Sequence, residues 1–414
     1  MHYKRERGDN MSISERQNDI LDIIKNLDIS PTMYRNAIEK YNHLTTYLEQ
    51  HGYAVTMYPQ GSFALGTVVR PIHKGDNASY DLDFIYQVSS PKKSITPKEL
   101  RDEVEAVLRD SHLYDDRLVV NDECFTIEYA DIGGIGFSID IVPATAEDEV
   151  KKLQLKSESS HPELIDDSIA IPKSENNRYS WLTNNPKGYR NWFTRSNGPY
   201  AALNRDEVRK TIFAQNTSLY NSVEDVPSDL ERSPVQRVIQ ILKYHRNVYY
   251  SKLPGGKDLK PISAIIGTLV AQIAEKQSPT TGTFDLLQCV LSELRIYSEH
   301  LTSEQSVFKQ AHPGKALLTR EGRNWVLRNP ANPEDNLADS WNQNSRIAPT
   351  FFKWLTCAYA DLISSLNLSD EEFRARVAGA FGDAHVRRVW GKKYERTPTR
   401  TLTTTSQAKP WRNQ

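Results

Sequence analysis

An alternating stretch at residues 80–86 constrains what this chain can fold into more than any other part of its sequence. It reads Tyr-Asp-Leu-Asp-Phe-Ile-Tyr, and successive side chains of a β-strand point to opposite faces of the sheet. Leu82 and Phe84 are therefore expected in a core, with Asp81 and Asp83 close together on the other face. Two carboxylates held that near repel one another unless a cation lies between them. Mg²⁺ suits such a pair, because it usually takes one or two protein carboxylates plus substrate phosphates.

Two further features flank this strand in the sequence. Upstream, Gly61 and Ser62 offer backbone N–H groups and a hydroxyl to phosphate oxygens, provided that a helix begins there. Downstream, Asp140 interrupts the apolar alternation Phe-Ser-Ile-Asp-Ile-Val at 137–142, so it faces away from the core. The predicted catalytic and metal-binding residues are Asp81, Asp83 and Asp140. They are interpreted as the site of a metal-dependent nucleotidyltransferase that holds two Mg²⁺ ions, with Mn²⁺ as a substitute.

The composition limits the partners and the compartment. Lys and Arg number 52 against 53 Asp and Glu, a formal charge of −1, whereas proteins that act on nucleic acid usually carry a basic surplus. The balance favours small nucleotide substrates and no obligatory nucleic acid. Cys124, Cys289 and Cys357 are odd in number and lack CxxC spacing, which argues against a disulfide framework and a zinc ribbon. No apolar run approaches ~18 residues and no signal peptide is recognised, so a cytoplasmic protein without membrane contacts is expected.

The order of the predicted elements indicates an α+β fold in two halves. Strands and helices alternate through the first half, which fits a mixed sheet covered by helices, and the later periodicity is helical. The predicted division is a disordered leader at 1–11, a catalytic domain at 12–198, a helical domain at 199–396 and a disordered tail at 397–414. The N-terminal helices are expected to pack partly on the second domain.

Some stretches carry more specific expectations. Residues 145–175 are charged and serine-rich and predict a surface excursion or a crossover. Residues 181–193 predict a loop-rich stretch dense in aromatic residues. A hairpin is expected within 312–333. Helices of the second half are predicted at 199–216, 234–250, 261–276, 283–303, 334–366 and 370–381.

Several candidate residues also have ordinary structural explanations. The helix that begins with the Ser-Pro cap at 233–234 leaves Lys243 off its apolar stripe, and such a lysine is as a rule solvated. Ser62 can simply cap the helix that starts near it. His245 and His385 have no partner at metal-ligand spacing and are interpreted as structural.

The Gly61-Ser62 pair, the Asp81/Asp83 pair and Asp140 together resemble the polymerase-β-type nucleotidyltransferase signature. More narrowly, the chain resembles the bacterial cGAS/DncV-like nucleotidyltransferases, or CD-NTases, of anti-phage CBASS systems. The stretches that carry this narrower resemblance are Ser30-Pro-Thr-Met-Tyr, Gln60-Gly-Ser-Phe-Ala-Leu-Gly-Thr, Pro234-Val-Gln-Arg-Val-Ile-Gln-Ile-Leu-Lys-Tyr-His-Arg and Asn329-Pro-Ala-Asn-Pro-Glu-Asp-Asn-Leu-Ala-Asp-Ser-Trp. The resemblance extends over about residues 12–390.

The resemblance implies an N-terminal catalytic sheet, a C-terminal helical bundle and an active site in the cleft between them. It implies that nucleoside triphosphates are joined into a cyclic di- or trinucleotide that activates a separate effector protein, and that regulatory proteins can take part. It also assigns Lys243 to the triphosphate, together with Gly61 and Ser62. Some relatives end in a residue that is conjugated to partners, and this chain, ending Trp-Arg-Asn-Gln, departs from that pattern.

Three alternatives fit parts of the sequence. A primer- or RNA-dependent enzyme that makes linear oligonucleotides, as oligoadenylate synthases do, would need a basic groove, which the charge balance disfavours. A non-catalytic binding module commonly lacks at least one catalytic acid, whereas all three aspartates are present here. A toxin–antitoxin nucleotidyltransferase that modifies a protein is usually a short single domain, unlike a chain with a long helical half.

Overall fold

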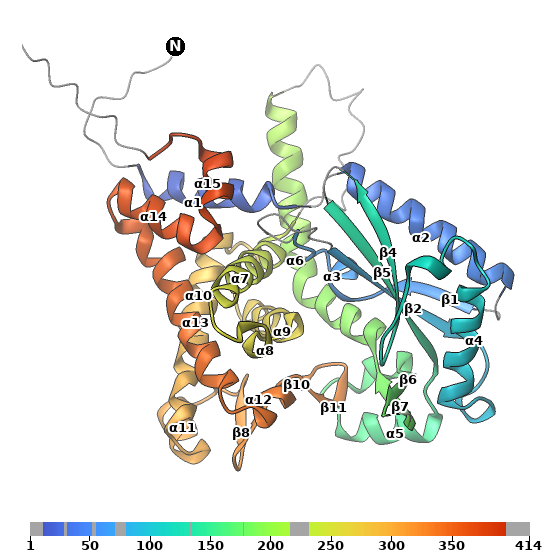
Figure 1. The fold of residues 1–414 in the computed structure, drawn as a ribbon. Coiled ribbons are helices and arrows are strands. Elements are labelled where there is room, and N and C mark those ends of the chain that lie inside the picture. The colour runs from blue at the N-terminus through green and yellow to red at the C-terminus, as the bar shows by residue number, and fades with distance from the viewer. Residues whose placement is uncertain are drawn as a thin grey trace, which may run out of the picture.

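The computed structural model describes residues 11–28, 31–51, 55–70, 80–132, 135–176, 178–215 and 232–394. The predicted leader, apart from Met11, and the predicted tail lie outside these ranges. One half of the described chain holds a sheet with helices against it, and the other half is mostly helical (Figure 1). This architecture confirms the predicted α+β class.

Seven strands of the described chain form one mixed sheet. They are β1 Val55–Pro59, β2 Tyr80–Val88, β3 Leu118–Val120, β4 Phe125–Ile132, β5 Ile135–Ala146, β6 Ile169–Glu175 and β7 Arg178–Asn184. The order is β1-β2-β5-β4-β3, with β6 paired to β5 and β7 paired to β6. Only β2 and β5 run parallel among these pairs, so the two strands with the predicted acids lie side by side within the sheet.

Helices α2 and α4 bury one face of this sheet (Figure 1). The helices of the first half are α1 Ile13–Lys25, α2 Pro31–His51, α3 Gly61–Ala64, α4 Pro97–Arg109, α5 Glu149–Glu158 and α6 Pro186–Gln215. Leu44 of α2 and Leu100 of α4 share a core cluster with Leu82 and Phe84 of β2. Both strand residues are fully buried, which confirms that they enter a core as the alternation predicted.

The second half is organised around α7. Its elements are α7 Pro234–Ser251, α8 Gly256–Leu259, α9 Ser263–Ala274, α10 Thr283–Ile296, α11 Gln305–Ala311, β8 Thr319–Glu321, β9 Asn324–Val326, β10 Arg328–Asn329, β11 Asn332–Asn336, α12 Asp339–Gln343, α13 Ile347–Leu362, α14 Asp370–Phe381 and α15 Asp383–Trp390. α7 begins with a capping box between Ser233 and Gln236 and has Pro234 in its first turn. It packs against α6, α9, α10 and α14, and α1 joins the same core through Ile20 and Ile23. No helix of the described ranges is long and apolar enough to cross a bilayer.

The sequence predicted a surface excursion or a crossover at residues 145–175, and this prediction is wrong for 169–175, where β6 belongs to the sheet. β6 pairs with β5 and, along its length, with β7, and Ile169 and Ile171 are buried. Only a short apolar run lies between charged segments here, so the local sequence does not show that the sheet will bury it.

The stretch 181–193 is also more regular than expected. α6 begins at Pro186 and continues across the predicted boundary between 198 and 199. Trp192 and Phe193 are buried in the helical core, and this tertiary packing outweighs the weak helix propensity of the local Asn, Gly and aromatic residues.

The hairpin expected within 312–333 is confirmed by the antiparallel pair β8 and β9, but 334–366 does not form one helix. β11 pairs with β10, and the helical part is divided between α12 and α13. The side chain of Asn336 accepts from the Leu327 N–H at 2.9 Å and donates to the Trp325 carbonyl at 2.9 Å. Such side-chain bonds to the backbone compete with a helix.

Ile139 of β5 tests how much the central strands contribute to stability. It is fully buried, and Ile139→Ala is expected to lower the free energy of unfolding by about 2–4 kcal/mol, since the removed methyl groups leave a cavity. Val150→Ala on α5, where Val150 is 82% exposed, should change it by less than about 0.5 kcal/mol. Urea denaturation followed by fluorescence measures both, and equal losses would contradict this assignment of the core.

Candidate active site

Two of the three predicted aspartates are neighbours across the parallel strands. Asp83 of β2 and Asp140 of β5 are Cα partners in the register, and adjacent strands lie about 4.8 Å apart. Their side chains leave the sheet on the face opposite Leu82 and Ile139. The backbone of Asp81 pairs with Ser138, two residues earlier on both strands. The side chain of Asp81 lies outside the described part of the structure.

The glycine turn lies directly against the first of these acids. The N–H of Gln60 donates to the carbonyl of Asp83 at 2.8 Å, and Gly61 has φ of +59°. A Cβ on Gly61 would collide with the Asp83 carboxylate, so only glycine permits this approach. The short helix α3 begins here with Gln60 as its N-cap. The alternative that Ser62 caps this helix is therefore wrong.

A row of polar side chains on α7 holds the chain that follows the turn. Gln236, Gln240 and Lys243 lie at i, i+4 and i+7 and so share one helix face. Their side-chain nitrogens donate to the carbonyls of Leu65 at 2.9 Å, Val68 at 2.9 Å and Thr67 at 2.8 Å, respectively. The helical half thus fixes the backbone at 65–68, immediately after the Gly61–Ser62 turn.

Lys243 is not solvated, contrary to the rule for a lysine off the apolar stripe. Only 5% of it is exposed, and burial, reinforced by the nearby Arg246 charge, lowers its pKa to about 7, while Asp83 acts in the opposite direction. The Lys243 amine donates to the Thr67 carbonyl at 2.8 Å. The second half of the chain therefore supplies a buried amine beside the backbone that follows the glycine turn.

Sequence reasoning missed Thr126, which orients Asp140. Thr126 is the partner of Asp140 across β4 and β5, and its hydroxyl donates to Asp140 Oδ1 at 2.6 Å. The Asn121 amide in turn donates to the Thr126 hydroxyl at 2.9 Å. The signal was available, because the alternation of β4 places Thr126 on the opposite face from the buried Phe125 and Ile127.

The donor set at this edge of the sheet fits hard divalent cations. Asp83 and Asp140 offer carboxylate oxygens from adjacent positions, which are the ligands that Mg²⁺ prefers. The absence of a side chain at Gly61 lets the Asp83 carboxylate lie directly against the backbone of the turn, where a Cβ would displace it. These residues can hold a metal together with a phosphate.

A second cluster, His245 with Cys357 and Asp361, has ligand atoms within 4.8 Å of one another but does not have the hydrogen bonding of a metal site. The indole N–H of Trp354 donates to His245 Nδ1 at 2.9 Å, so Nε2 carries the ring proton toward Asp361 at 3.2 Å. A metal on Nε2 would leave an N–H on Nδ1 facing the indole N–H. The cluster is a hydrogen-bonded network between α7 and α13. The sequence analysis found no partner for His245 at metal-ligand spacing and so did not detect Cys357 and Asp361 beside it.

The close approach at Gly61 can be tested against a glycine with the same backbone strain. Gly61→Ala and Gly314→Ala both place alanine at positive φ, +59° and +78°, which costs roughly 1–2 kcal/mol each. Only at Gly61 does the new Cβ meet another group, the Asp83 carboxylate. We expect Gly61→Ala to lose at least about 100-fold in pyrophosphate release and Gly314→Ala to keep normal release. Equal rates in the two variants would show that the approach is not required.

The buried Lys243 makes stability depend on pH. Its pKa is about 7 in the folded protein against 10.5 when unfolded, so between these values the unfolded chain binds more protons. The free energy of unfolding should rise with pH over this window by up to about 1.4 kcal/mol per unit. Lys243→Met should remove this rise and the exposed Lys309→Met should keep it, as measured by urea denaturation at pH 7 and pH 9. Parallel pH profiles for wild type and Lys243→Met would contradict the burial of the amine.

Comparison with known proteins agrees with this geometry. Residues 11–197 match the family model described as Second Messenger Oligonucleotide or Dinucleotide Synthetase domain (SMODS). The chain is 27% identical over 304 residues to a c-di-GMP synthase of Roseivirga ehrenbergii. The alignment covers 73% of this chain and 66%, just under two thirds, of that protein. It is 24% identical over 383 residues to the cyclic dinucleotide synthase CdnG of Bradyrhizobium diazoefficiens, covering 88% of this chain and 79% of that protein.

Solved structures show the same fold. The CD-NTase CdnG of Bradyrhizobium diazoefficiens in complex with GTP superposes with a TM-score of 0.63 at 21% identity, covering 91% of this chain and 98% of that one. CdnC of Escherichia coli MS115-1 with ATP gives 0.55 at 15% identity, covering 88% and 97%. The SMODS match over the sheet half, the two relatives and the shared two-part fold confirm the resemblance to the bacterial cGAS/DncV-like nucleotidyltransferases, the CD-NTases.

Proposed function

We propose that this enzyme joins nucleoside triphosphates into a cyclic di- or trinucleotide second messenger of an anti-phage (CBASS) system, releasing pyrophosphate. The observation that carries the proposal is the adjacency of Asp83 and Asp140 with the glycine turn against Asp83. Relatives named c-di-GMP synthase and cyclic dinucleotide synthase support the cyclic product.

The three aspartates would hold two Mg²⁺ ions, or Mn²⁺ in their place. When bound, such ions neutralise phosphate charge and increase the acidity of an attacking hydroxyl. The metal-binding residues are Asp81, Asp83 and Asp140. Thr126 donates to Asp140 Oδ1 and so fixes the orientation of this carboxylate, which we place next to the attacking hydroxyl.

The nucleotide-binding residues are Gly61, Ser62 and Lys243. In each joining step a ribose hydroxyl loses its proton and its oxygen bonds to the α-phosphorus of a second triphosphate, while the bond to pyrophosphate breaks. The Gly61 and Ser62 backbone N–H groups and the Ser62 hydroxyl would bind the phosphates, and the Lys243 ammonium would balance their charge. A final step of the same kind between the two ends of the linear product closes the ring.

The proposed partners follow from the product. A cyclic nucleotide carries information only if a separate effector protein binds it, so we place such an effector downstream. Regulatory proteins are a further proposal, supported by the structure of Escherichia coli CdnC in a complex with HORMA, which shares this fold at a TM-score of 0.55 and 15% identity. A cytoplasmic location agrees with both.

The main alternative is a primer- or RNA-dependent enzyme that makes linear oligonucleotides. Such an enzyme would use the same carboxylates and the same glycine turn as the proposed cyclic-nucleotide synthase. The two functions are therefore distinguished by their products. Resistance of the product to phosphatase marks a closed ring, whereas a linear product loses its terminal phosphates.

The test is to incubate the purified protein with all four nucleoside triphosphates and Mg²⁺ or Mn²⁺ and to identify phosphatase-resistant products by mass spectrometry. A cyclic species is expected, and Asp140→Asn should reduce its formation by about 10²–10³-fold or more. Asp116→Asn, which changes an exposed acid just before β3, is the matched control and should keep normal activity. Linear products that need a primer would favour the alternative, and normal turnover in Asp140→Asn would refute the assigned role.

A further inference from the structure

Asn121, in the turn between β3 and β4, begins a chain of hydrogen bonds that ends on Asp140. Its side-chain Nδ2 donates to the Thr126 hydroxyl at 2.9 Å, and that hydroxyl donates to Asp140 Oδ1 at 2.6 Å. Thr126 is the Cα partner of Asp140 across β4 and β5, whereas Asn121 lies just beyond the end of β3. The hydrogen-bonded path from this turn to the carboxylate therefore runs through the Thr126 hydroxyl.

The directions of these two bonds follow from the groups involved. An ionised carboxylate only accepts, so Thr126 uses its single proton toward Asp140. The Thr126 oxygen is then an acceptor for its other neighbour, and only the amide nitrogen of Asn121 can donate to it. The same nitrogen also donates to Cys124 Sγ, a weak acceptor, at 3.7 Å. Hydrogen bonds aligned in one direction polarise and so strengthen one another.

The backbone that carries Asn121 is fixed from α4. The guanidinium of Arg101, a residue that is only 4% exposed, donates to the carbonyl of Asp122 at 2.9 Å and to the carbonyl of Asn121. The Asn121 N–H closes the turn by donating to the Cys124 carbonyl at 3.0 Å, and the Ser174 N–H reaches the turn from β6. These bonds do not use the Asn121 side chain, so a substitution of that side chain leaves the turn in place.

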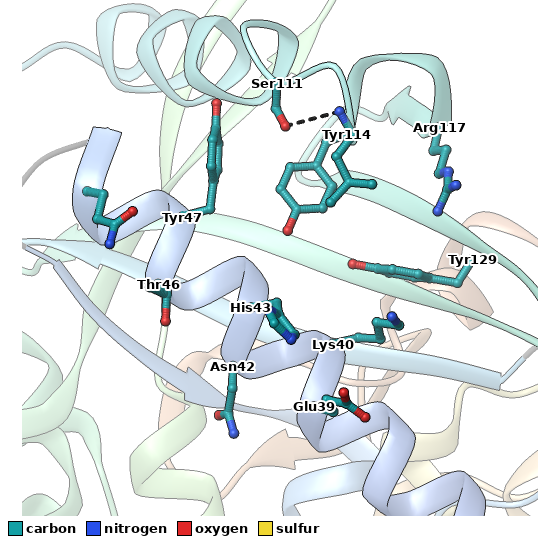
Figure 2. A pocket seen from close by; sticks show the side chains of 12 residues that line it. Glu39, Lys40, Asn42, His43, Thr46, Tyr47, Ser111, Tyr114, Arg117 and Tyr129 are labelled. Atoms are coloured by element: carbon teal, nitrogen blue, oxygen red, sulfur yellow. Dashed lines mark hydrogen bonds between the residues drawn. The ribbon is translucent and has the colours of Figure 1, made fainter.

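Strand β4 is held from its other face. Phe125 and Ile127 are fully buried, and the Tyr129 ring stacks on Phe137 at 4.7 Å between centroids. Figure 2 shows Tyr129 on the side of the sheet that α2 covers. With the strand backbone fixed by this packing, rotation about the Cα–Cβ bond decides where the Thr126 hydroxyl points. A threonine on a strand has more than one χ1 rotamer available, and the Asn121 amide stabilises the one that donates to the carboxylate.

We infer that Asn121 is a positioning residue for the joining reaction. By donating to the Thr126 hydroxyl it holds Thr126 in the rotamer that donates to Asp140 Oδ1, and so it presents the Asp140 carboxylate to a divalent cation in one orientation. The inference deepens the proposed function and rests on it, because that function assigns a cation to Asp140. Hydrogen-bonding partners behind metal-ligating side chains typically change metal affinity when they are removed.

Binding of Mn²⁺ alone tests this inference without turnover. The ion is titrated into the full chain, and the electron paramagnetic resonance signal of free Mn²⁺ gives the dissociation constant. Asn121→Leu keeps a side chain of similar size but removes the donor, and it should weaken binding about fivefold, the change expected for one hydrogen bond. Thr126→Val removes the hydroxyl itself and should weaken binding about tenfold or more. Equal dissociation constants for wild type and Asn121→Leu would overturn the inference.

Two further variants locate the effect. Asp140→Asn identifies the site in the titration, because it removes the carboxylate that Asn121 is inferred to position and should abolish binding there. Asn367→Leu makes the same substitution at an exposed position of the 3₁₀-helix Ser364–Asn367 in the helical half and should leave the affinity unchanged. Equal weakening by Asn121→Leu and Asn367→Leu would show a nonspecific effect and overturn the inference.

The double variant Asn121→Leu/Thr126→Val shows whether Asn121 acts through Thr126. If it does, the double variant should bind Mn²⁺ within about twofold of Thr126→Val alone, because the group on which Asn121 acts is already gone. Losses that multiply would show two independent effects and overturn the inference.

The rate of product formation at low and at saturating Mn²⁺ separates positioning from a general defect. Asn121→Leu should lose rate at low Mn²⁺ and approach the wild-type rate at saturating Mn²⁺, because excess metal compensates for weaker binding. A rate that stays low at saturating metal while the affinity is unchanged would show a structural defect and overturn the inference.

Failure of the proposed function gives a different result. A wild-type protein that binds Mn²⁺ but makes no cyclic product would count against the cyclic product alone, because the titration needs no turnover. A wild-type protein that binds no Mn²⁺ would count against the metal site, and the inference about Asn121 would be overturned with it.

Discussion

The hydrogen bonds from α7 to the backbone at 65–68 are the constraint on which the candidate site depends. Thr67 and Val68 are buried, so their carbonyls need partners, and Lys243 and Gln240 supply them. A buried carbonyl that loses its donor costs about 1–3 kcal/mol. The helical half therefore does more than pack beside the sheet, because it sets where the glycine turn lies relative to the carboxylates.

The charges at the candidate site would be balanced by a bound substrate and its metals. Asp83 and Asp140 bring negative charge together on adjacent strands, while Lys243 is buried with a pKa lowered to about 7. A triphosphate beside Lys243 would favour its charged form, and cations at the carboxylates would relieve their repulsion. In the proposed function, binding of the nucleotide and its metals would offset the cost of holding like charges together and of burying an amine.

Much of the catalytic half could be predicted from the sequence, because its signals are local. The alternation of β2 put Leu82 and Phe84 in the core, and the same reasoning singled out Asp140 on β5. The errors came where burial is supplied by distant segments. β6 carries too few apolar residues to stand out, and β11 replaces the start of a predicted helix because Asn336 bonds to the backbone of Leu327 and Trp325.

The sequence by itself determined which kinds of residue are available to the site. It also determined the alternation of the strands that puts the acids on one face, since both features are visible within a few neighbouring residues. Only the tertiary structure decided that Asp83 and Asp140 are direct neighbours, that Lys243 is buried rather than solvated, and that Thr126 orients Asp140. These facts depend on strand register and on helix packing between segments far apart in the chain. Such contacts are fixed by the whole core. The alternation of β4 gives the face on which Thr126 lies, but no local pattern of residues encodes which residue of another strand it meets.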